Sequence, residues 1–340
     1  MIVPRARFAL TLAASAAALL ALAAWSFAVG PFPVAFADVV RALWSALTGA
    51  ASGVAPNAQA VVVEIRGPRV AAALAVGAAL SAAGASYQSL FKNPLVSPDI
   101  LGVSAGCALG AGLAILLGLP IAAIQALAFG GGLLAVGLVV GICAWIEGRD
   151  PLLTLVLTGV VVGSLFGAGI ALVKYMADPY NQLPAITFWL LGSFSGALPR
   201  DLATALPGIG AGVLAMALLR WRMDVLALSD DEAGSLGVSV RRVRLAIIVA
   251  ATLVTASSVA LAGTIGWVGL VIPHAARLLV GAAYPRVLPL SLVLGAGFML
   301  AVDTVCRVAF PTEIPPGVAT AFVGTPAFLL LLAAGFRRSA

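Results

Sequence analysis

The chain has 340 residues, of which 62% are hydrophobic and 9% are charged, and its formal net charge is +6. Soluble domains carry about 25% charged residues, so this composition excludes an ordinary soluble protein. No charged residue occurs between Asp99 and Glu147. That interval is long enough for two helices of the roughly 20 residues that cross a bilayer. The sequence therefore predicts an all-α polytopic membrane protein.

Apolar segments bounded by charged residues, Pro or Gly predict ten membrane spans within a single domain, residues 1–340. The first apolar run is longer than the roughly 7–15 residues of a signal-peptide core, so we expect it to be retained. The uncharged segment 186–198 is too short to span and is predicted as an interfacial or re-entrant helix. The predicted spans cover residues 8–29, 70–91, 101–119, 121–146, 152–175, 202–219, 245–264, 267–282, 287–308 and 318–336.

Basic residues predict the orientation of these spans. An even number of spans places both termini on one side, and both ends carry arginines, within residues 5–7 and 337–338. Because Lys and Arg are enriched in cytoplasmic loops, that side is predicted to be cytoplasmic. Arg66 and Arg69 then fall on the outer side, where basic residues are unusual.

The longest polar interruption, residues 220–244, is predicted to project into the cytoplasm. Ser229, followed by Glu232 three residues later, fits a capping box at a helix N-terminus. Gly234 and Gly237 are predicted to end that helix. The segment should form a short helix, a turn and a second short element, although an ordinary charged loop would have the same composition.

The sequence lacks a nucleotide-binding signature. A phosphate-binding loop needs Lys followed by Ser or Thr, whereas Lys92 and Lys174, the only lysines, precede Asn and Tyr. The chain is therefore predicted to be no enzyme, and any ATP hydrolysis must be supplied by another polypeptide.

Metal and proton chemistry are also disfavoured. The single His274 and the scattered cysteines do not have metal-ligand or redox spacing, so neither a metal nor a cofactor is expected. Ion-coupled transporters keep ionisable groups at mid-membrane. Here all acidic residues are predicted to lie at span ends or in loops, with Asp303 the deepest. The cysteines are Cys107, Cys143 and Cys306.

The fifth predicted span has a small residue at every fourth position, at Gly159, Gly163 and Gly167. Such a smooth face allows close packing of helices in a membrane. Alternatively, it lines a pathway at a subunit interface. The composition of the span does not separate these two interpretations.

The segment Tyr87–Leu113, "YQSLFKNPLVSPDILGVSAGCALGAGL", has Pro94 and Pro98, which are predicted to break the helix just inside the cytoplasmic face. Five further segments belong to the same pattern, which covers nearly the whole chain. They are "RGPR", "FWLLGSFSGA", "LGVSV", "GTIGWVGLVIPHAARLLVG" and "VDTVCRVAFPTEIPPGVATAFVGTPAFLLLL". In this pattern the chain resembles the FecCD-like permease subunits of binding-protein-dependent ABC importers for siderophores, haem and cobalamin.

The resemblance implies a ten-span subunit that works as a homodimer in the bacterial inner membrane, with the pathway between the two copies. It also implies two cytoplasmic ATPase subunits and a periplasmic substrate-binding protein as partners, with no role for nucleic acid. The cargo would be an iron chelate, haem or cobalamin. The alternatives are a molybdate-type oxyanion or, from a different class, an ion-coupled secondary transporter.

The resemblance also implies roles for particular residues. Asn93 and Leu95 would form the cytoplasmic gate. Arg66, Arg69 and Arg307 would receive acidic residues of the binding protein, although they could instead meet lipid head groups or pair with Glu64 and Asp303. The predicted contacts to the ATPase are Ser229, Asp230, Asp231, Glu232, Gly234, Leu236 and Gly237.

Overall fold

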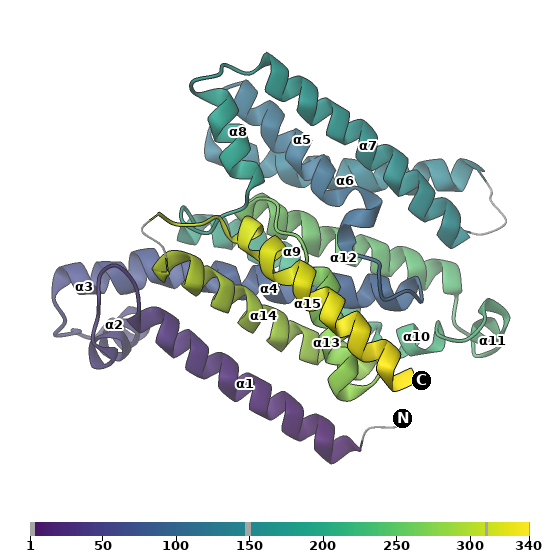
Figure 1. Cartoon of the computed structure of the whole chain (residues 1–340), viewed down its shortest axis with the longest axis horizontal. Coiled ribbons are helices and arrows are strands. Elements are labelled where there is room, and N and C mark those ends of the chain that lie inside the picture. The colour runs from purple at the N-terminus through teal and green to yellow at the C-terminus, as the bar shows by residue number, and fades with distance from the viewer. Residues whose placement is uncertain (1–3, 147–150, 310–311, 340) are drawn as a thin grey trace.

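The computed structural model describes residues 4–146, 151–309 and 312–339, and every regular element in these segments is a helix (Figure 1). The first nine labelled elements are α1 (Arg5–Ala28), α2 (Phe36–Thr48), α3 (Pro56–Ala60), the π-helix η1 (Val61–Arg66), α4 (Gly67–Leu90), the 3-10 helix η2 (Pro98–Leu101), α5 (Val103–Leu116), α6 (Ile121–Ile146) and α7 (Pro151–Met176). The remaining elements are α8 (Gln182–Leu190), α9 (Pro199–Leu218), α10 (Arg220–Val225), α11 (Asp230–Ser235), α12 (Val240–Ala262), α13 (Val268–Val280), α14 (Tyr284–Val308) and α15 (Pro316–Ser339).

Each of the ten predicted spans coincides with an apolar helix. Seven helical segments are long and apolar enough to cross a membrane, namely α1, the continuous helix Pro56–Leu90, α6, α7, α9, α12 and α14. The other three predicted spans correspond to the shorter apolar segments of α5, α13 and α15. The prediction of an all-α polytopic membrane protein is confirmed.

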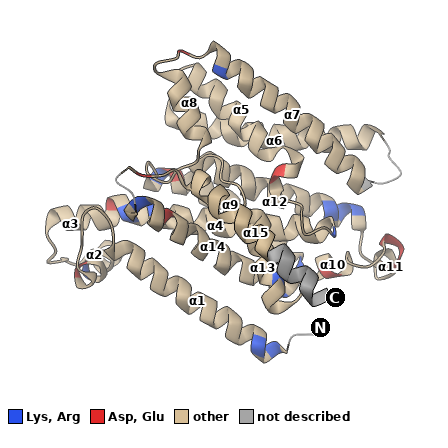
Figure 2. Cartoon of the chain, in the orientation of Figure 1, with Lys and Arg blue, Asp and Glu red and all other residues tan. Residues whose placement is uncertain are grey.

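The two ends of the bundle hold different elements, in agreement with the predicted orientation of the spans. The N-terminus and the C-terminus lie at the same end as α10 and α11, and α2 and α3 lie at the opposite end (Figure 1). Most charged residues lie toward these two ends (Figure 2). We call the end that holds both termini the cytoplasmic end and the opposite one the outer end.

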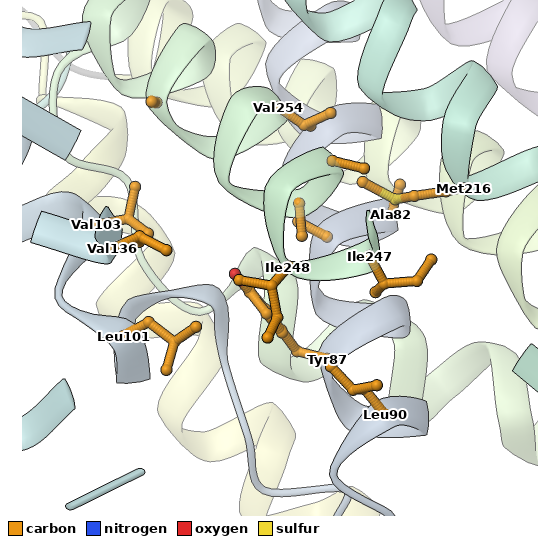
Figure 3. Packing of buried hydrophobic residues seen from close by; sticks show 14 of the residues in the cluster. Ala82, Tyr87, Leu90, Leu101, Val103, Val136, Met216, Ile247, Ile248 and Val254 are labelled. Carbon is orange, nitrogen blue, oxygen red and sulfur yellow. The ribbon is translucent and has the colours of Figure 1, made fainter. Parts of the chain in front are cut away.

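Helix α4 forms the centre of the bundle and packs against α9, α12, α13 and α14. Glycines allow this close approach: a Cβ on Gly77 would overlap the backbone of Gly295 in α14, and one on Gly84 would overlap Gly269 in α13. Small residues bring helix backbones together where lipid provides no hydrophobic drive for association. Figure 3 shows Tyr87 and Leu90 of α4 beside Ile247 and Ile248 of α12 in the resulting core.

Helices α5 and α13 are short because both begin inside the bundle. A Cβ on Gly269, near the start of α13, would lie 2.8 Å from Cδ of Pro98 and 2.9 Å from the carbonyl oxygen of Leu80. Leu80 is ten residues from the cytoplasmic end of α4, about 15 Å of helix rise. The prediction that Pro98 lies just inside the cytoplasmic face is therefore wrong. Residues 92–98 re-enter the bundle, which irregular backbone can do where protein surrounds it.

Three further segments differ from what the sequence predicts. The outer loop of residues 30–60 contains α2, whose Phe36, Trp44 and Leu47 are exposed. The helix of the second span is longer than predicted, because η1 joins α3 to α4. The segment predicted as an interfacial helix over 186–198 is helical only to Leu190, where α8 ends.

Candidate functional site

Three arginines converge at the outer end of the bundle, between α1, α4 and α14. Arg69 donates to both carboxylate oxygens of Asp303 at 2.7–3.1 Å and also to Glu313, at 3.1 Å through Nη1. Arg66 donates to the carbonyl oxygen of Phe27 at 2.6 Å and to that of Phe32. The cluster thus holds α1, α4 and α14 together.

The third member of the cluster, Arg307, donates to the carbonyl oxygen of Ser26 at 2.7 Å and to its hydroxyl at 3.1 Å. Arg307 is half-buried, whereas Arg66 is 3% exposed and Arg69 is 7% exposed. The structure brings the three predicted docking residues together, but it gives them internal partners. Their docking role stays a prediction.

The partners of the cluster were only partly foreseen. Pairing of an arginine with Asp303 was one of the predicted alternatives, and Arg69 makes it. Glu64 is exposed and forms no ion pair within the described segments. Glu313 was missed, since no local pattern links it to a residue 244 positions earlier. Its side chain is 34% exposed, so it lies where an approaching carboxylate could exchange with it.

The predicted gate residues lie in a tight turn at the cytoplasmic end. The side-chain oxygen of Asn93 accepts a hydrogen bond from the backbone N–H of Leu95 at 2.9 Å, and the backbone N–H of Asn93 donates to Gln88. An Asn side chain that bonds two residues onward is typical of a rigid turn. Leu95 is 54% exposed. We call residues 92–97 the gate turn.

The gate turn is connected to the cytoplasmic projection. The ammonium group of Lys92 donates a hydrogen bond to the carbonyl oxygen of Leu228 at 2.6 Å. A cavity of about 540 Å³ lies beside this connection and is lined by Gln88, Lys92 and Arg277, among others. The gate turn and the cytoplasmic projection are thus joined by one side-chain hydrogen bond.

The cytoplasmic projection has the predicted capping box. The Ser229 hydroxyl accepts from the backbone N–H of Glu232 at 3.3 Å, and the Glu232 carboxylate accepts from the backbone N–H of Ser229 at 2.9 Å. The Glu232 carboxylate accepts hydrogen bonds from the backbone N–H of Ser229 and from the Ser229 hydroxyl, and these two bonds lower the pKa of Glu232. Gly237 makes the turn with φ of +77°. The prediction that Gly234 ends the helix is wrong, because α11 continues through it to Ser235.

The projection is fixed to the bundle and carries an apolar tip. Arg244, at the base of α12, holds both oxygens of Asp230 at 2.8 and 3.0 Å. Ala233 is fully buried beneath the turn, whereas Leu236 is 57% exposed. Residues 220–244 thus form a rigid helix-turn element rather than a loose charged loop.

Of the three α7 glycines predicted to share a face, two have close neighbours in the same chain, and the pathway interpretation stays a prediction. Gly159 and Gly163 pack against η2 and Gly102 of the same chain, so close packing explains them. Gly167 has no neighbour within 4 Å of the position a Cβ would take. Its surroundings on α7 are exposed, including Leu165 at 66%.

A cavity of about 770 Å³ lies between η2, the loop before α13 and the first half of α15. Its lining includes the hydroxyls of Ser104, Thr264 and Thr325, the ring of Trp267 and the carboxylate of Asp99. Asp99 corrects the prediction that Asp303 is the deepest acid. Nothing in the local sequence sets the depth of the re-entrant segment, so this residue was missed. No group of His, Cys, Asp and Glu suited to a metal ion occurs within the described segments.

A polytopic helical chain with a re-entrant segment beside a cavity and a structured cytoplasmic projection is typical of the membrane subunit of a transport system. The model of the FecCD transport family matches residues 18–334, and the chain belongs to that family. It is therefore a permease subunit of an ABC importer, a class that is not itself enzymatic.

The names of similar proteins state different cargoes. The chain is 36% identical to the molybdate import system permease protein MolB of Haemophilus influenzae, over 97% of this chain and 95% of the relative. It is 39% identical to the cobalamin import system permease protein BtuC of Halobacterium salinarum, over 85% of this chain and 79% of the relative. A solved structure described as "an inward-facing conformation of a putative metal-chelate type ABC transporter" matches with a TM-score of 0.85 and 34% identity, covering 95% of this chain and 98% of that chain.

Proposed function

We propose that the chain works as a homodimer in the bacterial inner membrane and moves an iron chelate (a siderophore complex or haem) or cobalamin into the cytoplasm. A periplasmic binding protein delivers the cargo at the outer end, and two ATPase subunits bind at the cytoplasmic end. The observation that carries this proposal is the hydrogen bond between Lys92 of the gate turn and Leu228 of the helix-turn element.

The geometry of residues 220–244 supports coupling to an ATPase. The element is held by the Asp230–Arg244 ion pair and presents Leu236 to the outside. Burying an exposed leucine side chain against a partner contributes about 1.5–3 kcal/mol to binding. Closure of the ATPase would move this element as a body, and the Lys92–Leu228 connection would carry the movement to the gate turn.

The gate turn supports a closed state that is held without ATP. Asn93 and Pro94 keep the turn rigid, and Leu95 projects from it. In a homodimer the two copies of Leu95 would meet at the inner end of the pathway. An apolar constriction of this kind blocks polar cargo, because water and ions avoid it.

Docking at the outer end is supported by the excess of arginine there. Arg307 is the most exposed of the three predicted docking residues, and Arg69 is held on its accessible side by Glu313. A carboxylate of the binding protein could take the place of Glu313, because a guanidinium group holds carboxylates through parallel hydrogen bonds. On docking, Arg69 would then exchange the carboxylate of Glu313 for one of the binding protein and keep its ion pair with Asp303.

The function is tested by reconstituting the permease with its ATPase and binding protein in liposomes. We expect cargo to accumulate only when ATP is supplied, and mass spectrometry of the ligand retained by the purified binding protein identifies that cargo. Accumulation driven by a proton or sodium gradient without ATP would instead support a secondary transporter. Retention of molybdate or tungstate by the binding protein would support the oxyanion alternative.

A further inference from the structure

Asp99 lies deep among the membrane-spanning helices. The neighbouring Pro98 is level with Leu80, about 15 Å from the cytoplasmic end of α4. Helix α7 gives a similar depth. Gly159 of α7 packs against Ile100, which follows Asp99 in the chain. Gly159 is eight residues from the cytoplasmic start of α7, which corresponds to about 12 Å of helix rise. The apolar core of a bilayer is about 30 Å thick, so the carboxylate lies near its middle.

Asp99 has no internal cationic partner, since it takes part in none of the ion pairs of the described segments. Asp99 is exposed and contributes to the wall of the 770 Å³ cavity. It is the one ionisable side chain among the lining residues that the structure describes. The hydroxyl of Ser104 donates to Oδ1 of Asp99, and within the described segments Oδ2 accepts no hydrogen bond.

A structural role explains only part of this arrangement. The bond from Ser104 steadies the junction of η2 and α5, but a neutral Asn could accept that bond equally well. A free carboxylate at mid-membrane is costly, and such residues typically mark a pathway. A single sign of charge in a cavity with low-dielectric walls concentrates the potential and attracts ions of the opposite sign.

We propose that Asp99 determines the charge class of the cargo: the cavity forms part of the pathway and admits cationic and neutral chelates but disfavours oxyanions such as molybdate. This inference rests on the proposed function as an importer. In a homodimer each subunit would contribute one such carboxylate. The hydroxyls of Thr264 and Thr325 and the ring of Trp267 would then provide weak contacts to a bulky cargo as it passes.

The test measures the charge of the cavity without any cargo. Thr325 is exposed and lines the same cavity, so Thr325→Cys is introduced together with Cys143→Ser, since the other two cysteines are buried. In the assembled complex in lipid, a cationic and an anionic methanethiosulfonate of similar size are compared. We expect the ratio of cationic to anionic labelling rates to fall on the order of tenfold with Asp99→Asn. Asp99→Glu should preserve the ratio.

Four results separate the possibilities. An unchanged ratio with Asp99→Asn overturns the proposal, and so does a Thr325→Cys protein that reacts with neither reagent, because the cavity would then not be an aqueous pathway. ATP-driven uptake of molybdate by the wild-type complex also overturns it. Failure to import any cargo with ATP would refute the proposed function instead, while leaving the labelling result valid.

Discussion

Arg69 and Asp303 are separated by 234 residues in the chain, yet the guanidinium group of Arg69 donates hydrogen bonds to both carboxylate oxygens of Asp303 at 2.7–3.1 Å. Asp303 is fully buried and Arg69 is nearly so. Removing one member of such a buried ion pair strongly destabilises a protein, because the other charge is left buried without a partner.

We predict that Arg69→Met destabilises the subunit by about 3–5 kcal/mol, since Asp303 would lose its partner. Asp303→Asn should cost less, because Glu313 still pairs with Arg69. The measurement is denaturant- or heat-induced unfolding in detergent. Arg41→Met is the control: its pair with Asp38 is exposed and should contribute under about 1 kcal/mol. Equal stability of Arg69→Met and the control would contradict the prediction.

Docking at Arg69 is tested by Glu313→Gln, which frees the guanidinium group from an internal competitor. If a carboxylate of the binding protein takes this place, affinity should rise about fivefold and depend more steeply on salt. Surface plasmon resonance with the reconstituted complex measures both. Reversing Arg66 and Arg69 to Glu is less informative, because both side chains are buried and the subunit itself would be disturbed.

The matched control for docking is Glu64→Gln, which removes an exposed acid near the outer end that has no ion pair in the described segments. It should leave the affinity nearly unchanged. If Glu313→Gln behaves in the same way, Arg69 serves the fold and not the partner. Arg307→Gln should then be examined, since that side chain is more accessible.

The gate is tested by Leu95→Ala. Removing the exposed side chain from the gate turn should increase leak of a small polar dye from liposomes in the absence of ATP severalfold, because the apolar constriction becomes wider. Leu117→Ala truncates a leucine of similar exposure (68%) outside the gate turn and should not change the leak. A normal leak in a correctly assembled Leu95→Ala dimer would argue against the gate.

Coupling is tested by Leu236→Ala, which removes the apolar tip of the helix-turn element. We expect binding of the ATPase to weaken about tenfold, as on loss of an interface anchor, with the fold of the permease unchanged. Leu214→Ala on α9, of similar exposure, is the control. Ala233→Pro should uncouple ATP hydrolysis from uptake, since the Ala233 N–H donates to the carbonyl oxygen of Ser229 at 2.9 Å. Normal transport by both variants would contradict the role of this element.

Helix contact through glycine is tested by Gly84→Ala. The added methyl group would overlap the carbonyl group of Gly269, so we expect a loss of about 1–3 kcal/mol or more in stability. Gly130→Ala, in α6, meets no atom within 4 Å and should be neutral or stabilising by up to about 1 kcal/mol. Thermal unfolding in detergent distinguishes the two; equal midpoints would exclude close packing at Gly84.

The sequence by itself determined the features that depend on neighbouring residues. Apolar length predicted where the helices run, because every backbone polar group in a bilayer must be satisfied within its own segment. The spacing of Ser229 and Glu232 predicted the capping box, since both hydrogen bonds close within one turn. The helix break at Pro94 was also predictable locally, because proline cannot donate the backbone hydrogen bond that a helix interior needs.

Only the tertiary structure decided the depth of Asp99, the burial of Arg66 and the pairing of Arg69 with Glu313. Each depends on contacts between helices far apart in the chain. Gly269 lets Pro98 approach α13, and this contact sets the level of the re-entrant segment. Composition cannot specify such a level, because an apolar helix and its charged neighbours have the same local pattern whether they face lipid, a cavity or another helix.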